Sequence, residues 1–160
     1  MTGIFNRRYI FIRLEEMLIR ATREQNGLCV VIIDLDHFKT INDNLGHARG
    51  DVVLREFAHR LKASMRPYDL IGRYGGEEFI VAVSDVGLHM AKAMLERFLR
   101  QLNADEFEAA GECLKVTFSA GVADIRELGS EPQLESLLSR ADARPDAAKH
   151  AGRNRIVASD

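Results

Sequence analysis

The sequence predicts an α/β (α+β) protein in which helices flank a mixed central β-sheet. Two observations favour this class. Short runs of β-branched residues alternate with longer segments whose apolar residues recur at helical spacing, and one β-hairpin motif interrupts the alternation. The 160 residues suit a single domain over residues 1–160. A domain of this size buries about two-thirds of its unfolded surface, so it needs no disulfide or metal to fold.

The first half of the chain predicts three helices and one buried strand. Residues 11–24 carry apolar side chains at helical spacing, and residues 28–33 form a continuous apolar run that Asp34 closes. Residues 38–45 predict a short helix, because Gly46 can cap its end. Residues 51–65 show the helical period again, and Pro67 stops that helix.

The second half predicts a hairpin followed by alternating helices and strands. Residues 70–74 and 79–83 flank a turn at 75–78 whose two glycines favour a tight reversal. The remaining predicted elements are a helix over residues 88–102, a strand over 113–120, a helix over 134–141 and a last strand over 155–158.

Composition excludes several classes of partner. The 22 Lys and Arg residues nearly balance the 24 Asp and Glu residues, giving a net charge of −2. No broad basic field is available, so we expect no binding to DNA or RNA. No apolar run reaches the roughly 20 residues that cross a bilayer, so we expect no membrane contact by this segment. Cys29 and Cys113 are predicted to be buried, reduced thiols, which indicates a cytoplasmic domain, either free or anchored through another part of its protein.

Carboxylates gather at two places that the predicted sheet can bring together. Asp34 ends the buried strand and Asp36 follows it, while Glu77 and Glu78 lie at the hairpin turn. If the hairpin lies beside the buried strand, Asp34 and Glu77 meet at one end of the sheet. Crowded carboxylates repel one another unless a cation lies between them, and hard oxygen ligands suit Mg²⁺. The alternatives are that Asp36 is a solvated loop charge and that the glycines merely close a hairpin.

Several segments then resemble the GGDEF family of diguanylate cyclases. RYGGEEF at 73–79 resembles the family signature in its GGEEF form. In family order, the others are TGIFNRR at 2–8, DLDHFKTIND at 34–43, GHARGD at 46–51, SAGVA at 119–123 and KHAGRNR at 149–155. The resemblance extends from Thr2 to Arg155, nearly the whole chain. It implies a palm-like fold shared with adenylyl cyclases and polymerases.

The resemblance also implies roles for matching positions. Asp34, Glu77 and Glu78 are the expected catalytic residues. Asp34, the backbone carbonyl of Leu35 and Glu77 are expected to bind the metal on the triphosphate and Glu78 a second metal, with Mg²⁺ as the metal and Mn²⁺ as an alternative. Guanine recognition is expected of Asn42 and Asp51, whose side chains can accept from or donate to the base edge. Phosphate contacts are expected of Lys39, Lys149, Arg153 and the backbone N–H groups around His37 and Phe38, with Gly75 and Gly76 allowing close approach. The alternatives are that Asp51 is a helix N-cap, that Asn42 is a turn residue and that the cations are solvated.

The implied function is the condensation of two GTP molecules into cyclic di-GMP and pyrophosphate. In the family, two GTP-loaded domains face each other, so we expect a homodimer during catalysis. Arg66 and Asp69 match the family's RxxD inhibitory site, so cyclic di-GMP is expected as an inhibitor as well as the product. The resemblance also implies that residues 1–160 form one domain of a longer protein with an upstream regulatory region.

One segment departs from the family pattern. Where the family has Ala-Leu-Tyr, this chain has Arg144-Pro145-Asp146. Because proline disfavours helix interiors, we expect a break near Arg144, which would displace Lys149 and Arg153. This departure favours one rival function, a catalytically silent domain that binds GTP or cyclic di-GMP as a sensor. A second rival is a cyclase that makes a hybrid dinucleotide.

Overall fold

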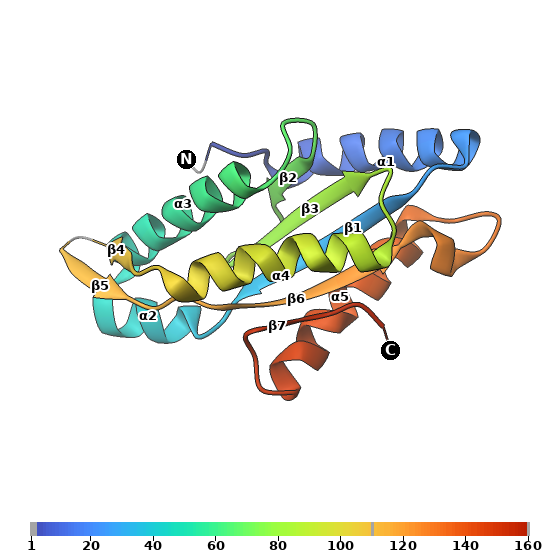
Figure 1. Cartoon of the computed structure of the whole chain (residues 1–160). Coiled ribbons are helices and arrows are strands. Elements are labelled where there is room, and N and C mark those ends of the chain that lie inside the picture. Colours follow the sequence, from blue (N-terminus) through green and yellow to red (C-terminus); the bar gives the residue numbers. More distant parts are fainter. Residues whose placement is uncertain (1–2, 110, 160) are drawn as a thin grey trace.

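A five-stranded sheet forms the centre of the molecule in the computed structural model, which describes residues 3–109 and 111–159 (Figure 1). Thr2, where the family resemblance begins, lies outside the described residues. The strands, in sheet order, are β2 (Leu70–Arg73), β3 (Glu78–Ser84), β1 (Leu28–Leu35), β6 (Phe118–Asp124) and β7 (Arg155–Val157). Only β6 and β7 pair in parallel, and the other pairs are antiparallel. The predicted mixed sheet is therefore confirmed.

Helices cover both faces of the sheet, which gives three layers (Figure 1). One face packs against α3 (His47–Ser64) and α4 (Leu88–Ala104), and the other against α1 (Arg7–Glu24) and α5 (Leu134–His150). The smaller elements are α2 (Phe38–Leu45), the 3₁₀ helix η1 (Ile125–Leu128) and a separate hairpin of β4 (Phe107–Ala109) and β5 (Glu112–Leu114). Within residues 3–109 and 111–159, no helix has the length and apolar character needed to span a membrane.

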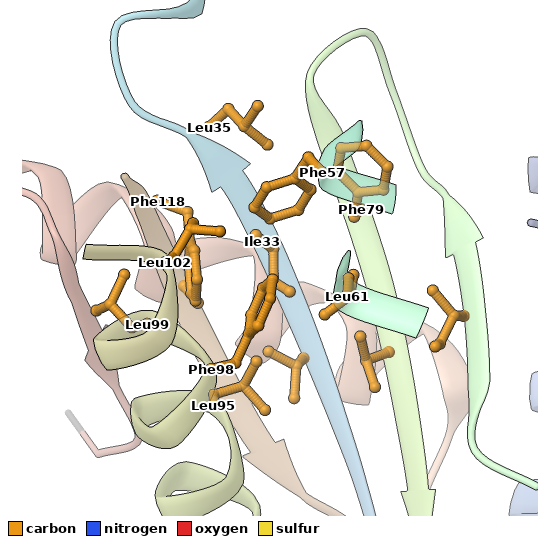
Figure 2. Close-up of a cluster of buried hydrophobic side chains, with 14 of the residues drawn as sticks. Ile33, Leu35, Phe57, Leu61, Phe79, Leu95, Phe98, Leu99, Leu102 and Phe118 are labelled. Carbon is orange, nitrogen blue, oxygen red and sulfur yellow. The ribbon is translucent and has the colours of Figure 1, made fainter. Parts of the chain in front are cut away.

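All eight residues of β1 are buried, because the strand supplies side chains to both layers. Val31 and Ile33 point toward α3 and α4, whereas Val30 and Ile32 lie on the α1–α5 side. Figure 2 shows Ile33 among aromatic rings on the first side, where the Phe57 ring centroid lies 5.0 Å from that of Phe79 and 5.9 Å from that of Phe118. A packed aromatic core thus supports the end of β1 that carries Asp34.

Three sequence-based expectations need correction. The strand predicted over 113–120 is two strands, β5 and β6, which belong to different sheets. Cys29 is buried as expected, and burial together with nearby Asp124 raises the pKa of its thiol. Cys113 is exposed on β5, so the prediction that both cysteines are buried is wrong. Asp51 lies inside α3, whose N-cap is Gly46, so the N-cap alternative for Asp51 is wrong as well.

The predicted break in the last helix is also wrong. Helix α5 continues through Pro145 to His150. Gly121 on β6 lacks a side chain where α5 packs against it; a Cβ there would lie 2.7 Å from Cδ of Pro145. Beside the proline, the Arg144 guanidinium donates to the carbonyl of Val122 and to Glu127. Close packing and buried hydrogen bonds therefore retain a helix that local propensity disfavours.

Candidate active site

The hairpin lies directly beside the central strand, as predicted. In the antiparallel pairing of β1 with β3, Asp34 is opposite Glu78. The backbone N–H of Leu35 donates to the carbonyl of Glu77 at 3.2 Å, which extends the pairing beyond the strand. The end of β1 and the glycine turn therefore form one acidic edge of the sheet.

The two glycines of the turn have different surroundings. A Cβ on Gly75 would overlap the carboxylate of Glu78, so a side chain there would displace that acid. A Cβ on Gly76 would meet nothing within 4 Å, so this side of the turn is open to a ligand. The Arg73 guanidinium donates to the Gly76 carbonyl at 2.7 Å and braces the turn. The turn thus orients Glu78 and leaves free approach next to it.

Electrostatics at this edge are unfavourable for ionised carboxylates. Burial raises the pKa of Asp34, and the charges of Glu77 and Asp36 raise it further, although Lys149 opposes them. Burial also raises the pKa of Glu78, with additional repulsion from Asp34. A nearby cation stabilises the ionised form of carboxylates that are buried and close to other negative charges. The arrangement is the one expected of a site that binds positive charge.

Lys149 supplies one such charge. Its Nζ donates to Oδ2 of Asp34 at 2.7 Å, across 115 residues of sequence. Burial lowers the pKa of Lys149, but the hydrogen bond with Asp34 and the surrounding acids outweigh it and raise the pKa overall. The continuous α5 therefore brings Lys149 to the acidic edge, and the expected displacement of this residue is wrong.

Asp36 behaves differently from Asp34. It is 4% exposed and accepts from the Thr117 hydroxyl at 2.7 Å, the Ser119 hydroxyl at 2.7 Å and the Asn154 N–H at 3.0 Å. The interpretation of Asp36 as a solvated loop charge is therefore wrong. Arg153 and Asn154 both have left-handed backbones, with φ of 62° and 51°. Asp36 thus anchors the loop that carries Arg153, a role that sequence spacing could not reveal.

The predicted guanine-reading residues lie where α2 meets α3. Asn42 packs so tightly on Gly50 that a Cβ on the glycine would overlap the amide oxygen, and Asp51 follows in the next position. Oδ1 of Asn42 is buried and has no hydrogen-bond partner among the described residues. An unpartnered buried acceptor costs about 1–3 kcal/mol, so an oxygen of this kind favours a ligand that brings an N–H donor.

The predicted phosphate-binding residues are brought less closely together. His37 has a left-handed backbone, with φ of 56°, at the start of α2, and Phe38 behind it is 8% exposed. Within residues 3–109 and 111–159, Lys39 and Arg153 are exposed and form no ion pair. Of the three predicted phosphate cations, Lys149 alone contacts the acidic edge through an ion pair in the described part of the chain.

The acidic edge suits a divalent cation that keeps part of its own shell. Among the described residues, no three His, Cys, Asp or Glu side chains converge as a complete metal cage. Asp34 and Glu78 nevertheless lie opposite each other and both have raised pKa values. Mg²⁺ in proteins is usually held by one or two carboxylates and completes its shell with water and substrate phosphates. The donor set therefore fits Mg²⁺ bound together with a phosphorylated substrate.

Comparison with known proteins now decides the family. A family model described as "Diguanylate cyclase, GGDEF domain" matches residues 1–155. The chain belongs to the GGDEF family. The response regulator PleD of Caulobacter vibrioides is 43% identical over 159 residues, which cover 98% of this chain and 35% of PleD. The diguanylate cyclase DgcP of Pseudomonas aeruginosa is 39% identical over 156 residues, which cover 98% of this chain and 23% of DgcP. This GGDEF domain thus spans about a third or less of these relatives.

Solved structures agree with the fold. The diguanylate cyclase SiaD of Pseudomonas aeruginosa was solved in complex with its activator SiaC and has a TM-score of 0.90 at 36% identity. The match covers 98% of this chain and 59% of the SiaD chain. The GGDEF domain of DgcB from Caulobacter crescentus was solved in complex with c-di-GMP and has a TM-score of 0.90 at 29% identity. The match covers 98% of this chain and 91% of the DgcB chain.

The predicted inhibitory residues of this GGDEF domain bind each other. Nη2 of Arg66 donates to Oδ1 of Asp69 at 2.9 Å, and the Arg66 N–H donates to Oδ2 at 2.8 Å. The Asp69 side chain is fully buried, whereas that of Arg66 is 31% exposed and stacks on Tyr68 with its Cζ 4.7 Å from the ring centroid. Arg66 is therefore accessible to a ligand, while Asp69 is already engaged.

Sequence reasoning missed the support behind the turn. The Arg7 guanidinium lies 4.7 Å from the ring centroid of Tyr74 and donates to the Tyr74 carbonyl at 3.3 Å. Asp142 on α5 adds to the repulsion that raises the pKa of Glu78. Arg7 lies in residues 2–8, which resemble the family, but nothing in the sequence indicated that its partner would be Tyr74, the residue before Gly75.

Proposed function

We propose that this domain is a diguanylate cyclase that condenses two GTP molecules into cyclic di-GMP and two molecules of pyrophosphate. One observation carries the proposal: Asp34 and Glu78 lie opposite each other at the edge of the sheet, beside the open Gly76, and both are held with raised pKa values. Acids in this condition are suited to metal-assisted phosphate chemistry.

The residues take the following parts. Asp34, the Leu35 carbonyl and Glu77 would hold one Mg²⁺ at the triphosphate, and Glu78 would hold a second. When bound, the metal activates the attacking hydroxyl and offsets charge on the phosphates. The Asn42 amide and the Asp51 carboxylate bind the guanine edge. Lys149 contacts the triphosphate, and Lys39 and Arg153 approach it from exposed positions. The backbone N–H groups at His37 and Phe38 also face phosphate oxygens.

The reaction requires two copies of the domain. The 3′-oxygen of each GTP forms a bond to the α-phosphorus of the other, the bond from that phosphorus to pyrophosphate breaks, and the hydroxyl proton leaves. One copy presents only one GTP, so the homodimer completes the site. Arg66, which is held in place by the buried Asp69, binds the product, and this binding slows the enzyme.

The silent-domain alternative loses its main support. It rested on the Arg144-Pro145-Asp146 segment, but α5 is continuous and Lys149 is 2.7 Å from Asp34.

The test is incubation of concentrated protein with GTP and Mg²⁺, with and without an equal amount of ATP, followed by identification of the products. Cyclic di-GMP and pyrophosphate in both reactions are expected. Formation of a mixed dinucleotide in the second reaction would show that the domain also accepts ATP and would overturn the proposed specificity for GTP. Binding of GTP or cyclic di-GMP without any GTP consumption would instead support a sensor domain.

A further inference from the structure

Arg144 is a buried cation that lies outside the acidic edge. It is 2% exposed, and its guanidinium donates to Glu127 through Nη1 at 3.0 Å and through Nη2 at 2.7 Å. It also donates to the carbonyl of Val122 on β6. A guanidinium that forks onto a carboxylate and also bonds a strand backbone fixes both distance and direction. This contact therefore sets how α5 lies on β6.

Glu127 is itself held in place. The Asp124 N–H donates to its Oε1 at 2.8 Å, and Asp124 and Glu127 form a capping box at the start of η1. The Asp124 side chain also accepts from the Arg126 N–H at 2.9 Å. Asp124 also accepts from the Leu88 N–H at the start of α4 at 3.1 Å. Arg144 thus joins α5 to a rigid junction of β6, η1 and α4.

The next residue weakens the helix at the same place. Proline has no N–H, so Pro145 cannot donate to the carbonyl of Ala141, four residues earlier. The last part of α5, which carries Lys149, is therefore attached to the rest of the helix with one bond fewer. Lys149 lies five residues after Arg144, or about 7.5 Å along the helix axis. A small change of direction at Pro145 would move Nζ of Lys149 away from Asp34.

We propose that Arg144 is a positioning residue for Lys149: its anchorage to Glu127 and β6 fixes the direction of the helix end that the proline would otherwise loosen. Arg144 occurs in the segment that departs from the family pattern, and in this chain it compensates for the proline beside it. The kinetic consequence rests on the proposed function, but the placement of Lys149 does not.

The first measurement needs no nucleotide. The reactivity of each lysine toward an amine-labelling reagent is followed by mass spectrometry in wild type and Arg144→Met, which keeps a long side chain and removes the charge. We expect Lys149 to label several-fold faster in the variant, because its pairing with Asp34 is loosened, while exposed Lys39, Lys62 and Lys115 stay unchanged.

Two control variants separate position from stability. Arg140→Met removes the other arginine that pairs with Glu127, at 3.4 Å, from a side chain that is 34% exposed, and it should leave Lys149 labelling unchanged. Leu137→Ala removes a fully buried side chain before the proline and lowers stability without touching the Arg144 anchorage. If either control raised Lys149 labelling as much as Arg144→Met, the proposal would be overturned. Should Arg144→Met fail to fold, Glu127→Gln replaces it, and unchanged labelling in that variant would overturn the proposal equally.

The second measurement uses turnover. In Arg144→Met we expect KM for GTP to rise about tenfold, or about 1.4 kcal/mol, with a smaller change in kcat. A loss confined to kcat, with KM unchanged, would contradict a role through Lys149. If wild type consumes no GTP, the proposed function fails, whereas the labelling experiment still decides the role of Arg144.

Discussion

The two ends of the central sheet hold their carboxylates in opposite electrostatic conditions. At one end, Asp34 and Glu78 face each other and their pKa values are raised. At the other end, burial alone would raise the pKa of Glu127, but hydrogen bonds from Arg144 and from the Asp124 backbone lower it overall. Glu127 holds elements of the fold together through its hydrogen bonds. Asp34 and Glu78 carry more negative charge than the single ion pair with Lys149 balances. The imbalance, rather than the number of acids, marks the candidate site.

The largest expected effect comes from removing a carboxylate of the acidic edge, where burial and neighbouring acids raise the pKa values of Asp34 and Glu78. Asp34→Ala, and likewise Glu77→Ala, should abolish turnover, with a loss of several powers of ten at roughly 1.4 kcal/mol per tenfold. Stability should change little, because the substitution at Asp34 also removes repulsion. Steady-state turnover and thermal melting of the same preparations test both statements. Near-normal turnover in Asp34→Ala would remove Asp34 from the catalytic residues.

An alanine substitution at the other end of the sheet should have the reverse outcome, a loss of stability without a loss of catalysis. Asp124 is 4% exposed and accepts from the N–H groups of Leu88 and Arg126. Asp124→Ala should lower the free energy of unfolding by about 2 to 4 kcal/mol, because a cap is lost and buried donors are left unpaired. Urea denaturation measures the loss, and kcat per folded molecule at saturating GTP should be retained. Equal stability of variant and wild type would contradict the stabilising role of the acids at this end of the sheet.

A smaller effect is expected at the inhibitory residues. Arg66→Ala should weaken cyclic di-GMP binding by about 10- to 100-fold, the value of one charge-assisted contact, and should relieve product inhibition. Initial turnover without product should stay near wild type. Calorimetric titration is done at a temperature where both proteins are folded, since Asp69 loses its ion pair with the guanidinium in the variant. Equal affinities would argue against this site.

The smallest effect concerns pH. Because the pKa of Glu127 is lowered in the folded state, its ion pair stabilises the protein above the ordinary carboxyl value of 4.5, and this contribution is lost as pH falls through the folded pKa. Wild type should therefore be more stable than Glu127→Gln at pH 7, and the difference should shrink below about pH 4. Denaturation curves at both pH values test this. A difference that grows in acid would show that the sign is wrong.

Local patterns predicted most of what defines the fold and the acidic edge. The apolar run before Asp34 and the glycine turn at Gly75 are local signals, and together they led to the juxtaposition of β1 with the hairpin. The partners of Asp36 could not be foreseen, because Thr117, Ser119 and Asn154 lie 81, 83 and 118 residues away. Such contacts depend on how the whole chain folds, not on spacing.

The last helix shows the same limit. Proline propensity alone predicted a break, and this failed because tertiary packing overrides a local cost. What decided the outcome was the missing side chain of Gly121 and the anchorage of Arg144, both on the contact between α5 and β6. The strand predicted over 113–120 failed for a related reason. Residues 112–114 pair with β4, a strand too short for its residue pattern to predict.

The segment before α1 gives the turn a mechanical connection. The Phe5 N–H donates to the Ile71 carbonyl at 3.3 Å, and the Arg73 N–H donates to the Phe5 carbonyl at 3.0 Å, so Phe5 lies along the outer edge of β2. Arg7 then reaches the Tyr74 carbonyl, one residue before Gly75. The residues around the start of α1 are therefore hydrogen-bonded both to the outer edge of β2 and to the residue before Gly75. The backbone that enters the glycine turn is thus held by residues that lie more than 60 positions earlier in the chain.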